Sequence, residues 1–351
     1  MFTRISPQAL RLLALLAVMA IVVLFFASQI EGYLNGRLFN RISSSVAIMA
    51  LIATGQTLVI LTRNIDLSVG SVVGFSAFAT GSLIAGQPDL HPLVLLGYSG
   101  LVGAGFGLVN GLLVAYARIP SIIVTLATMA LFRSFLVEYS DAKSITAATL
   151  PTWLMDFPNM PVFSLGDVEF RAGFTASVIV VILAHFALTR LRPARQFFAV
   201  GSNPEAADMA GIDARRVVFA AFLISGVMAG LAGFMFLARF GNITVVAGLG
   251  FELKSVASAV VGGVNIFGGS GSVIGAFLGA VLVDLLETSL VRWDVVSEFW
   301  REAVLGAMIL AAVAADTLFS RRLARLRTAR AQKAAPDAAP GAAPDASEAG
   351  K

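Results

Sequence analysis

The sequence of 351 residues contains no cysteine and only two histidines, His91 and His185. Without cysteine the chain forms no disulfide, has no thiolate nucleophile and offers no sulfur ligand to a metal. Neither histidine belongs to an HExxH pattern or a similar ligand spacing, and both are expected near helix ends. The sequence therefore predicts no metal or cofactor site on this chain.

Charged residues are scarce as well. They make up 13% of the chain, against about 25% in soluble globular domains, while 58% of residues are hydrophobic and the mean hydropathy is +0.86. The formal net charge of +4 does not indicate nucleic-acid binding, because the arginines cluster at the ends of apolar runs and in the C-terminal segment. The composition predicts a polytopic membrane protein surrounded by lipid.

Catalytic and nucleotide-binding patterns are missing too. The sequence has no GxxxxGK[ST] phosphate loop and no Ser/His/Asp grouping. The chain is therefore expected not to be an enzyme and not to bind ATP by a phosphate loop. The carboxylates Glu138, Asp284 and Glu287 fall toward the predicted outer ends of helices, which disfavours coupling to ions.

Apolar runs of about 17–25 residues predict membrane-spanning helices. Ten are expected, at 9–29, 46–62, 70–87, 93–117, 119–138, 173–189, 217–240, 253–267, 273–290 and 302–319. The first is interpreted as a signal anchor, because no small-residue cleavage pattern follows it. Most lysines and arginines then fall on one side, which predicts that both termini are cytoplasmic. The expected fold is all-α.

Two regions are expected along the chain. Residues 1–320 form the membrane domain, with a cytoplasmic loop at 190–216. Residues 321–351 form a cytoplasmic tail, first basic and then rich in alanine and proline, which is expected to be disordered because it cannot bury a core. Small-xxx-small spacing predicts close helix packing at two glycine series: Gly103, Gly107 and Gly111 in one run, and Gly226, Gly230 and Gly233 in another.

The stretch ILTRNIDLSVGSVVG, residues 60–74, interrupts the apolar pattern with charge. A charge at the bilayer centre costs roughly 2.5–3.5 kcal/mol on insertion scales. We interpret the stretch as a tight turn, in which Arg63 ends one helix and Asp66 or Ser68 caps the next.

A second segment resembles this one. Residues 59–74 and 260–275 share seven of sixteen aligned positions, which indicates an internal repeat with both turns on the same side of the membrane. Paired glycine-interrupted segments flank the substrate path in transporters. The candidate turn and pathway residues are therefore Asn64, Asp66, Ser68, Gly70, Asn265 and Gly271.

Uncharged polar residues also fall inside the predicted helices. Gln56, Asn110 and Thr125 are the candidates for a solute path, because amides and hydroxyls can exchange hydrogen bonds with a polyhydroxylated solute. The alternative is that each bonds to a neighbouring helix.

The segment AVGSNPEAADMAGID, residues 199–213, predicts a short helix in the cytoplasmic loop. Asn203 is a good N-cap, Pro204 fits the first helical position, Glu205 complements the helix dipole and Gly211 ends the helix. A two-turn helix is not stable alone in water, so its alanine and methionine surface is expected to bind a partner. The residues of that surface are Ala206, Ala207 and Met209.

Four segments together resemble the permease subunits of carbohydrate ABC importers, in the ribose, xylose, arabinose and galactoside permease family. They are GQTLVILTRNIDLSVGS (55–71), NGLLVAYARIPSIIVTLATM (110–129), AVGSNPEAADMAGI (199–212) and GFELKSVASAVVGGVNIFGGSGSVIG (250–275). Residues 293–310 more weakly resemble the rhamnose and autoinducer-2 permeases. The family usually has two glycines where this chain has Arg63 and Asn64, an acidic residue near Lys254, and a second alanine at Ser258.

The resemblance implies an ABC importer permease that moves a monosaccharide-like solute across the bacterial inner membrane. It also implies three partners: a second permease subunit, an ATP-binding cassette subunit that holds ATP and Mg, and a periplasmic solute-binding protein. In this family the helix at 203–211 would be the coupling helix that docks on the ATP-binding subunit. The alternative is a self-sufficient secondary carrier or facilitator for a small polar solute.

Overall fold

The computed structural model describes residues 7–293 and scattered positions between 295 and 314. Eight of its helices are long and apolar enough to cross a membrane. They are α1 (Pro7–Gln29), α2 (Gly36–Leu61), α3 (Val69–Gly86), α4 (Pro92–Gly111) with its π-helical extension η1 (Leu112–Tyr116), α5 (Ser121–Ser140), α7 (Ala172–Arg190), α10 (Ala214–Phe240) and α12 (Val273–Arg292).

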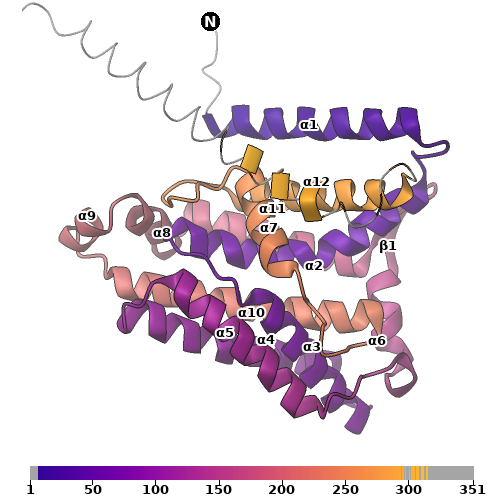
Figure 1. Ribbon diagram of the computed structural model, residues 1–351, viewed down its shortest axis with the longest axis horizontal. Coiled ribbons are helices and arrows are strands. Elements are labelled where there is room, and N and C mark those ends of the chain that lie inside the picture. Colours follow the sequence, from indigo (N-terminus) through magenta and orange to yellow (C-terminus); the bar gives the residue numbers. More distant parts are fainter. Residues whose placement is uncertain are drawn as a thin grey trace, which may run out of the picture.

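Shorter elements connect them. These are η2 (Ala147–Thr149), α6 (Thr152–Asp156), η3 (Phe157–Asn159), the strands β1 (Pro161–Leu165) and β2 (Val168–Arg171), α8 (Arg192–Ser202), α9 (Pro204–Met209) and α11 (Phe251–Val261). Figure 1 shows the long helices side by side, with α8 and α9 at one end of the bundle and the β1–β2 hairpin and α6 at the other. We call these the α9 end and the hairpin end. The polytopic, predominantly α-helical fold predicted from the sequence is confirmed.

The central helix of the bundle is α2. Every residue from 46 to 61 is buried, and α2 packs against α7, α10, α11 and α12. By contrast, α1, α4, α5 and α7 expose most of their apolar surface, as expected for helices that face lipid. The core therefore consists mainly of α2, α3, α10 and α12.

The predicted span at 253–267 is wrong. Helix α11 has 11 residues, about 16 Å, and is too short to cross a hydrocarbon core of roughly 30 Å. It ends at Val261, and the chain then follows a glycine-rich turn to α12, with positive φ at Gly263, Gly268 and Gly269. The predicted span at 302–319 lies for the most part outside the described residues, as does the tail at 321–351. The count of ten helices is therefore not confirmed.

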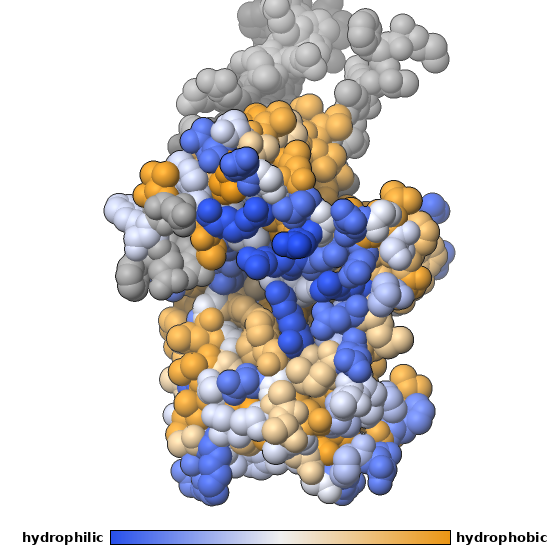
Figure 2. Space-filling model, turned by 90° about the vertical axis from the view of Figure 1, so that its right-hand side faces the viewer, coloured by the Kyte–Doolittle hydropathy of each residue, from blue (hydrophilic) through white to orange (hydrophobic). Residues whose placement is uncertain are grey.

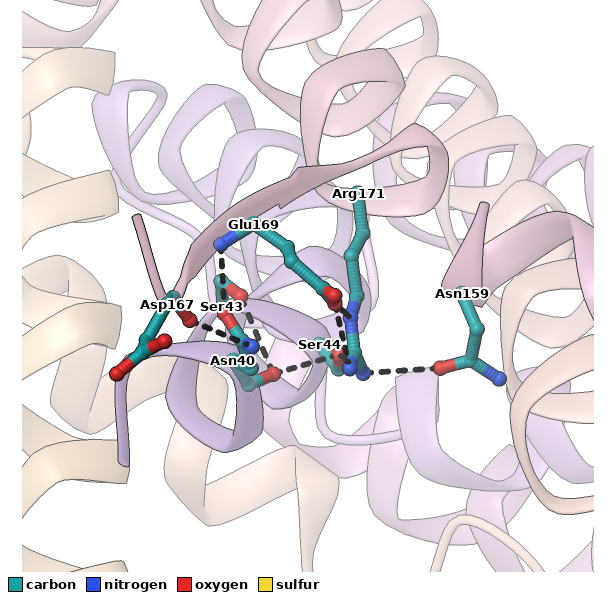
Figure 3. A network of polar contacts seen from close by, with 7 residues as sticks. All are labelled: Asn40, Ser43, Ser44, Asn159, Asp167, Glu169 and Arg171. Atoms are coloured by element: carbon teal, nitrogen blue, oxygen red, sulfur yellow. Dashed lines mark hydrogen bonds and ion pairs between the residues drawn. The ribbon is translucent and has the colours of Figure 1, made fainter. Parts of the chain in front are cut away.

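The hairpin end is built around the first turns of α2, which Figure 3 shows from close by. The amide nitrogen of Glu169 donates to Asn40 Oδ1 at 3.0 Å, and Asn40 Nδ2 donates to the carbonyl of Asp167 at 3.4 Å. Arg171 forms an ion pair with Glu169 at 3.0 Å and donates to Asn159 Oδ1 at 3.0 Å. The hairpin was not expected from the sequence, which predicts only that residues 139–172 connect the spans at 119–138 and 173–189. On this end of the molecule hydrophilic side chains gather in the middle, between apolar flanks (Figure 2).

The predicted glycine series bring α4 and α10 into contact. A Cβ at Gly103 would collide with the carbonyl oxygen of Gly226, and one at Gly226 would collide with that of Gly103. The two backbones therefore approach as closely as glycine allows.

This contact can be tested with a pair of substitutions on one helix. Gly103→Ala is expected to lower the free energy of unfolding by about 1–3 kcal/mol or more, because the added methyl overpacks the α4–α10 contact. Gly105→Ala is the control, since a Cβ there meets nothing within 4 Å. The measurement is thermal unfolding of the purified chain in detergent. Equal midpoints for the two variants would contradict the packing assignment.

Candidate functional site

The turn at 62–68 leaves the end of α2 through a left-handed residue. The amide nitrogens of Arg63 and Asn64 donate to Ile60 and Val59 carbonyls at 2.9 and 3.2 Å, and Arg63 has φ +66°. This conformation is unfavourable for a residue with a Cβ and suits glycine. Asn64 Nδ2 donates back to the Thr62 carbonyl at 2.8 Å, which stabilises the turn locally.

Asp66 lies at the centre of a buried polar cluster. Its Oδ1 accepts hydrogen bonds from the amide and the hydroxyl of Ser68, at 3.0 and 2.7 Å, and its Oδ2 accepts one from Ser225 of α10 at 3.4 Å. Ser68 Oγ in turn accepts a bond from Asn110 Nδ2 of α4 at 2.8 Å. All four side chains are at most 2% exposed. We call Asp66, Ser68, Asn110 and Ser225 the Asp66 cluster.

The cluster lies well inside the bundle. Ser225 is roughly 16 Å along α10 from its first residue, which lies at the α9 end. Burial away from water makes an ionised carboxylate costly, and the hydrogen bonds from Ser68 and Ser225 offset part of that cost.

The side-chain cap expected from Asp66 or Ser68 at the start of α3 is not formed. Ser68 is the N-cap residue of α3, but its own side chain makes no capping bond to the helix. Asp66 instead accepts the Ser68 amide, two residues further along the chain. The first turn of α3 then passes close to the chain before α11, since a Cβ at Gly70 would collide with Gly248 and the Glu252 carboxylate.

Helix α5 holds the same turn from another side. Thr125 Oγ1 donates to the Ile65 carbonyl at 3.3 Å, and the Ile65 amide donates to Ser121 Oγ at 3.2 Å. The sequence-predicted residues Asp66, Ser68, Asn110 and Thr125 therefore meet around one turn. Ser225 and Ser121 were missed, because isolated serines in apolar helices carry no distinctive pattern.

Gln56 lies on α2, fully buried. Neither of its amide atoms has a hydrogen-bond partner among the described residues, and the same holds for Asn110 Oδ1. An unpaired buried polar group costs about 1–3 kcal/mol, so both side chains favour a partner such as water or a hydroxylated solute. They remain candidates for a solute path.

The predicted loop helix is present as α9. Asn203 caps it by accepting the Ala206 amide at 3.1 Å, Pro204 is its first residue, and Glu205 lies in its first turn. After α9, Gly211 adopts φ +79°. Sequence capping rules therefore predicted both ends of this helix.

The outward face of α9 differs from the one expected. Met209 is 91% exposed and Ala206 is exposed, but Ala207 is only 4% exposed and packs into the core. The prediction that Ala207 belongs to the partner-facing surface is wrong, because α9 lies on the bundle by that residue. Met209 and Ala206 form the free apolar surface.

Arg63 connects the turn to the segment just before α9. Its Nε donates to the Gly201 carbonyl at 2.6 Å and its Nη2 to the Ser202 carbonyl at 2.7 Å. The Gly269 amide donates to the Leu61 carbonyl at 3.0 Å, so the second glycine-rich turn meets the same point. Arg63 thus lies at the α9 end, where it fixes α8 and α9 to the end of α2.

The two turns of the expected repeat share backbone geometry. The amides of Gly263 and Val264 bond to the carbonyls of Val260 and Ala259 as those of Arg63 and Asn64 bond to Ile60 and Val59, and Gly263 has φ +86°. This match in backbone geometry is displaced by one residue from the sequence alignment, which pairs Arg63 with Val264. Asn265 and Gly271 lie in this second turn. Asn265 Oδ1 accepts a hydrogen bond from the Phe267 amide at 2.9 Å. Within the part of the chain that the structure describes, neither Asn265 nor Gly271 is hydrogen-bonded to the Asp66 cluster.

Two substitutions separate the bonds of Arg63 from its strain. Arg63→Ala loses both bonds and keeps an unfavourable φ, whereas Arg63→Gly loses the bonds but suits the left-handed region. We expect unfolding temperature to fall in the order wild type, Arg63→Gly, Arg63→Ala, with about 1–2 kcal/mol between the two variants. Thermal unfolding in detergent measures this. A glycine variant at least as stable as wild type would show that the two bonds stabilise the protein no more than the left-handed conformation of Arg63 destabilises it.

Comparison with known proteins gives a consistent result. Residues 38–313 match the family model described as "Branched-chain amino acid transport system / permease component". The Autoinducer 2 import system permease protein LsrC of Yersinia enterocolitica is 35% identical over 303 residues, 86% of this chain and 81% of that protein. The D-allose transport system permease protein AlsC of Escherichia coli is 33% identical over 305 residues, 87% of this chain and 91% of that protein. No solved structure matches.

Proposed function

The chain belongs to the family of branched-chain amino acid transport system permease components, and from this premise we propose that it imports a monosaccharide-like solute by an ATP-driven mechanism. Like its relatives, the chain is a transport permease subunit and not an enzyme. In the proposed assembly a second permease subunit completes the path, a separate ATP-binding subunit holds ATP and Mg, and a periplasmic binding protein delivers the solute. Both termini would lie in the cytoplasm.

The choice of a sugar-like solute is supported by the buried amides of Gln56 and Asn110 and by the name of one relative. AlsC is named as the permease of a D-allose transport system, and D-allose is a monosaccharide. The unpaired amide of Gln56 can both donate to and accept from hydroxyl groups, and Asn110 Oδ1 can accept from one. These groups suit a neutral polar solute that must be released after binding.

The observation that carries the ATP-driven mechanism is the connection through Arg63. A six-residue helix, α9, projects Met209 from the α9 end, and Arg63 joins its base to the turn that holds Asp66. Movement of α9 by a partner would therefore reach the buried cluster through one short segment of chain, 63–66. A solvated loop helix would not need these bonds.

Reconstitution tests the proposal. The chain alone in liposomes is expected not to accumulate monosaccharide, whereas the chain with its ATP-binding subunit, ATP, Mg and binding protein should accumulate it. Uptake of labelled D-allose and of a panel of aldoses and branched-chain amino acids measures this. Accumulation driven by an ion gradient in the absence of the ATP-binding subunit would instead support the secondary-carrier alternative.

A further inference from the structure

A second polar site lies away from the Asp66 cluster, in a pocket of about 170 Å³ between α2, α10, α11 and α12. Four charged side chains and two phenylalanine rings line it: Arg239, Lys254, Asp284, Glu287, Phe240 and Phe251. Its volume is well above the roughly 10–15 Å³ needed for one water molecule.

The pocket belongs to the hairpin-end half of the bundle. Arg239 is the last residue but one of α10, and Glu287 lies in the second half of α12, whose end reaches the hairpin end. Ser45 contributes from the first half of α2. Hydrophilic side chains gather in the middle of this end of the molecule (Figure 2), so a polar solute can approach it.

The charges in the pocket balance. Lys254 Nζ and Glu287 Oε1 form an ion pair at 2.7 Å, and each side chain remains about a quarter exposed, at 26% and 24%. Arg239 and Asp284 add one more basic and one more acidic side chain. The lining therefore has no excess of either kind, which suits a solute without a net charge.

One acceptor in the pocket has no partner. Asp284 Oδ2 is buried and has no hydrogen-bond partner among the described residues. A buried carboxylate oxygen favours a donor strongly, because hydrogen bonds to charged groups are worth more than neutral ones. A solute hydroxyl can supply that donor and still accept a bond from Arg239 or Lys254.

The rings add an apolar surface beside these groups. The Arg239 guanidinium carbon lies 5.1 Å from the Phe240 ring centre, and Lys254 Nζ lies 6.0 Å from that of Phe251. Pockets that bind small molecules combine such apolar surfaces with a few convergent polar groups. A sugar ring presents the matching pattern, with C–H faces and a rim of hydroxyls.

We propose that this pocket binds a neutral polyhydroxylated solute of monosaccharide size as it enters the permease from the hairpin end. The proposal rests on the proposed function and adds the place in the permease where its solute binds. A branched-chain amino acid presents polar groups at one end only, whereas a monosaccharide presents hydroxyls around its whole rim. Hydroxyls would instead donate to Asp284 and Glu287 and accept from Arg239 and Lys254.

The absence of cysteine makes a direct test possible. Ser45→Cys places one thiol of similar size at the pocket. Ser44→Cys places a thiol at the preceding residue of α2, which does not line the pocket. In the full importer in membrane vesicles, a charged, membrane-impermeant thiol reagent added at the hairpin end should modify both. The monosaccharide that wild type takes up best should slow modification of Ser45→Cys several-fold and leave Ser44→Cys unchanged, while leucine should affect neither.

Each other outcome overturns the proposal. These outcomes are protection by leucine, protection of both cysteines or of neither, and failure of the reagent to reach Ser45→Cys while it reaches Ser44→Cys. If wild type accumulates a monosaccharide but no protection occurs, only the pocket assignment fails. If wild type takes up no monosaccharide, the proposed function fails and the pocket assignment with it.

A second measurement avoids the introduced cysteine. The same monosaccharide should raise the unfolding temperature of the purified wild-type chain, because a ligand that binds the native state stabilises it. Asp284→Asn, which removes the negative charge and turns one acceptor into a donor, should raise the concentration needed for half the effect about tenfold or more. An unchanged half-effective concentration would overturn the assignment of Asp284.

Discussion

Replacing Met209 by glutamate is expected to abolish binding of the ATP-binding subunit and, with it, solute uptake. Met209 is 91% exposed at the tip of α9, and Ala206 is its small exposed neighbour. A methionine inserted into an apolar groove loses its contacts on replacement, and the new carboxylate would be buried without a partner there. We expect a loss of at least about 100-fold in affinity, measured by co-purification and by solute-stimulated ATP hydrolysis.

The hairpin end offers a matched control. Met160 is also exposed, at 56%, but lies at the opposite end of the bundle. Met160→Glu should therefore leave co-purification of the ATP-binding subunit intact. Normal co-purification and normal uptake in the Met209→Glu protein would remove the coupling assignment from α9.

Replacing Asp66 by leucine is expected to cost about 3–9 kcal/mol of stability and to abolish transport. The substitution leaves the Ser68 amide, the Ser68 hydroxyl and the Ser225 hydroxyl without an acceptor inside the bundle, at about 1–3 kcal/mol each. Asp66→Asn keeps an acceptor for Ser68 and should cost about 1 kcal/mol. Thermal unfolding and uptake at equal membrane abundance measure the two effects.

If Asp66→Asn and Asp66→Leu abolish transport equally while both remain folded in the membrane, the hydrogen-bond account of Asp66 is insufficient. A direct contact between the carboxylate and the solute would then explain the result better.

Local rules predicted the parts of the molecule that depend on local chemistry. The cap at Asn203 and the turn at Gly211 follow from backbone groups within a few residues, so the ends of α9 could be read from sequence. The spacing of the glycines predicted close helix packing at both series, but not that α4 and α10 pack against each other. The family was recognised correctly because its motifs include these local features.

Features that depend on distant contacts were not predictable in this way. The 11-residue length of α11 is hidden in a largely apolar run that continues past Val261, where only Gly262 and Gly263 mark its end. The burial of Ala207 depends on how α9 lies on the bundle. The bonds from Arg63 to Gly201 and Ser202 join residues that are more than a hundred positions apart, which no periodicity can show.

Helix α2 is apolar enough to enter a membrane, yet its last sixteen residues, 46–61, are all buried against other parts of the folded protein. Packing these residues against other apolar helices gains little free energy when the alternative surrounding is lipid. The hydrophobic character of α2 therefore serves its delivery into the bilayer during biosynthesis, before its neighbours arrive. A polar substitution that the finished bundle could accommodate would still reduce the yield of inserted protein.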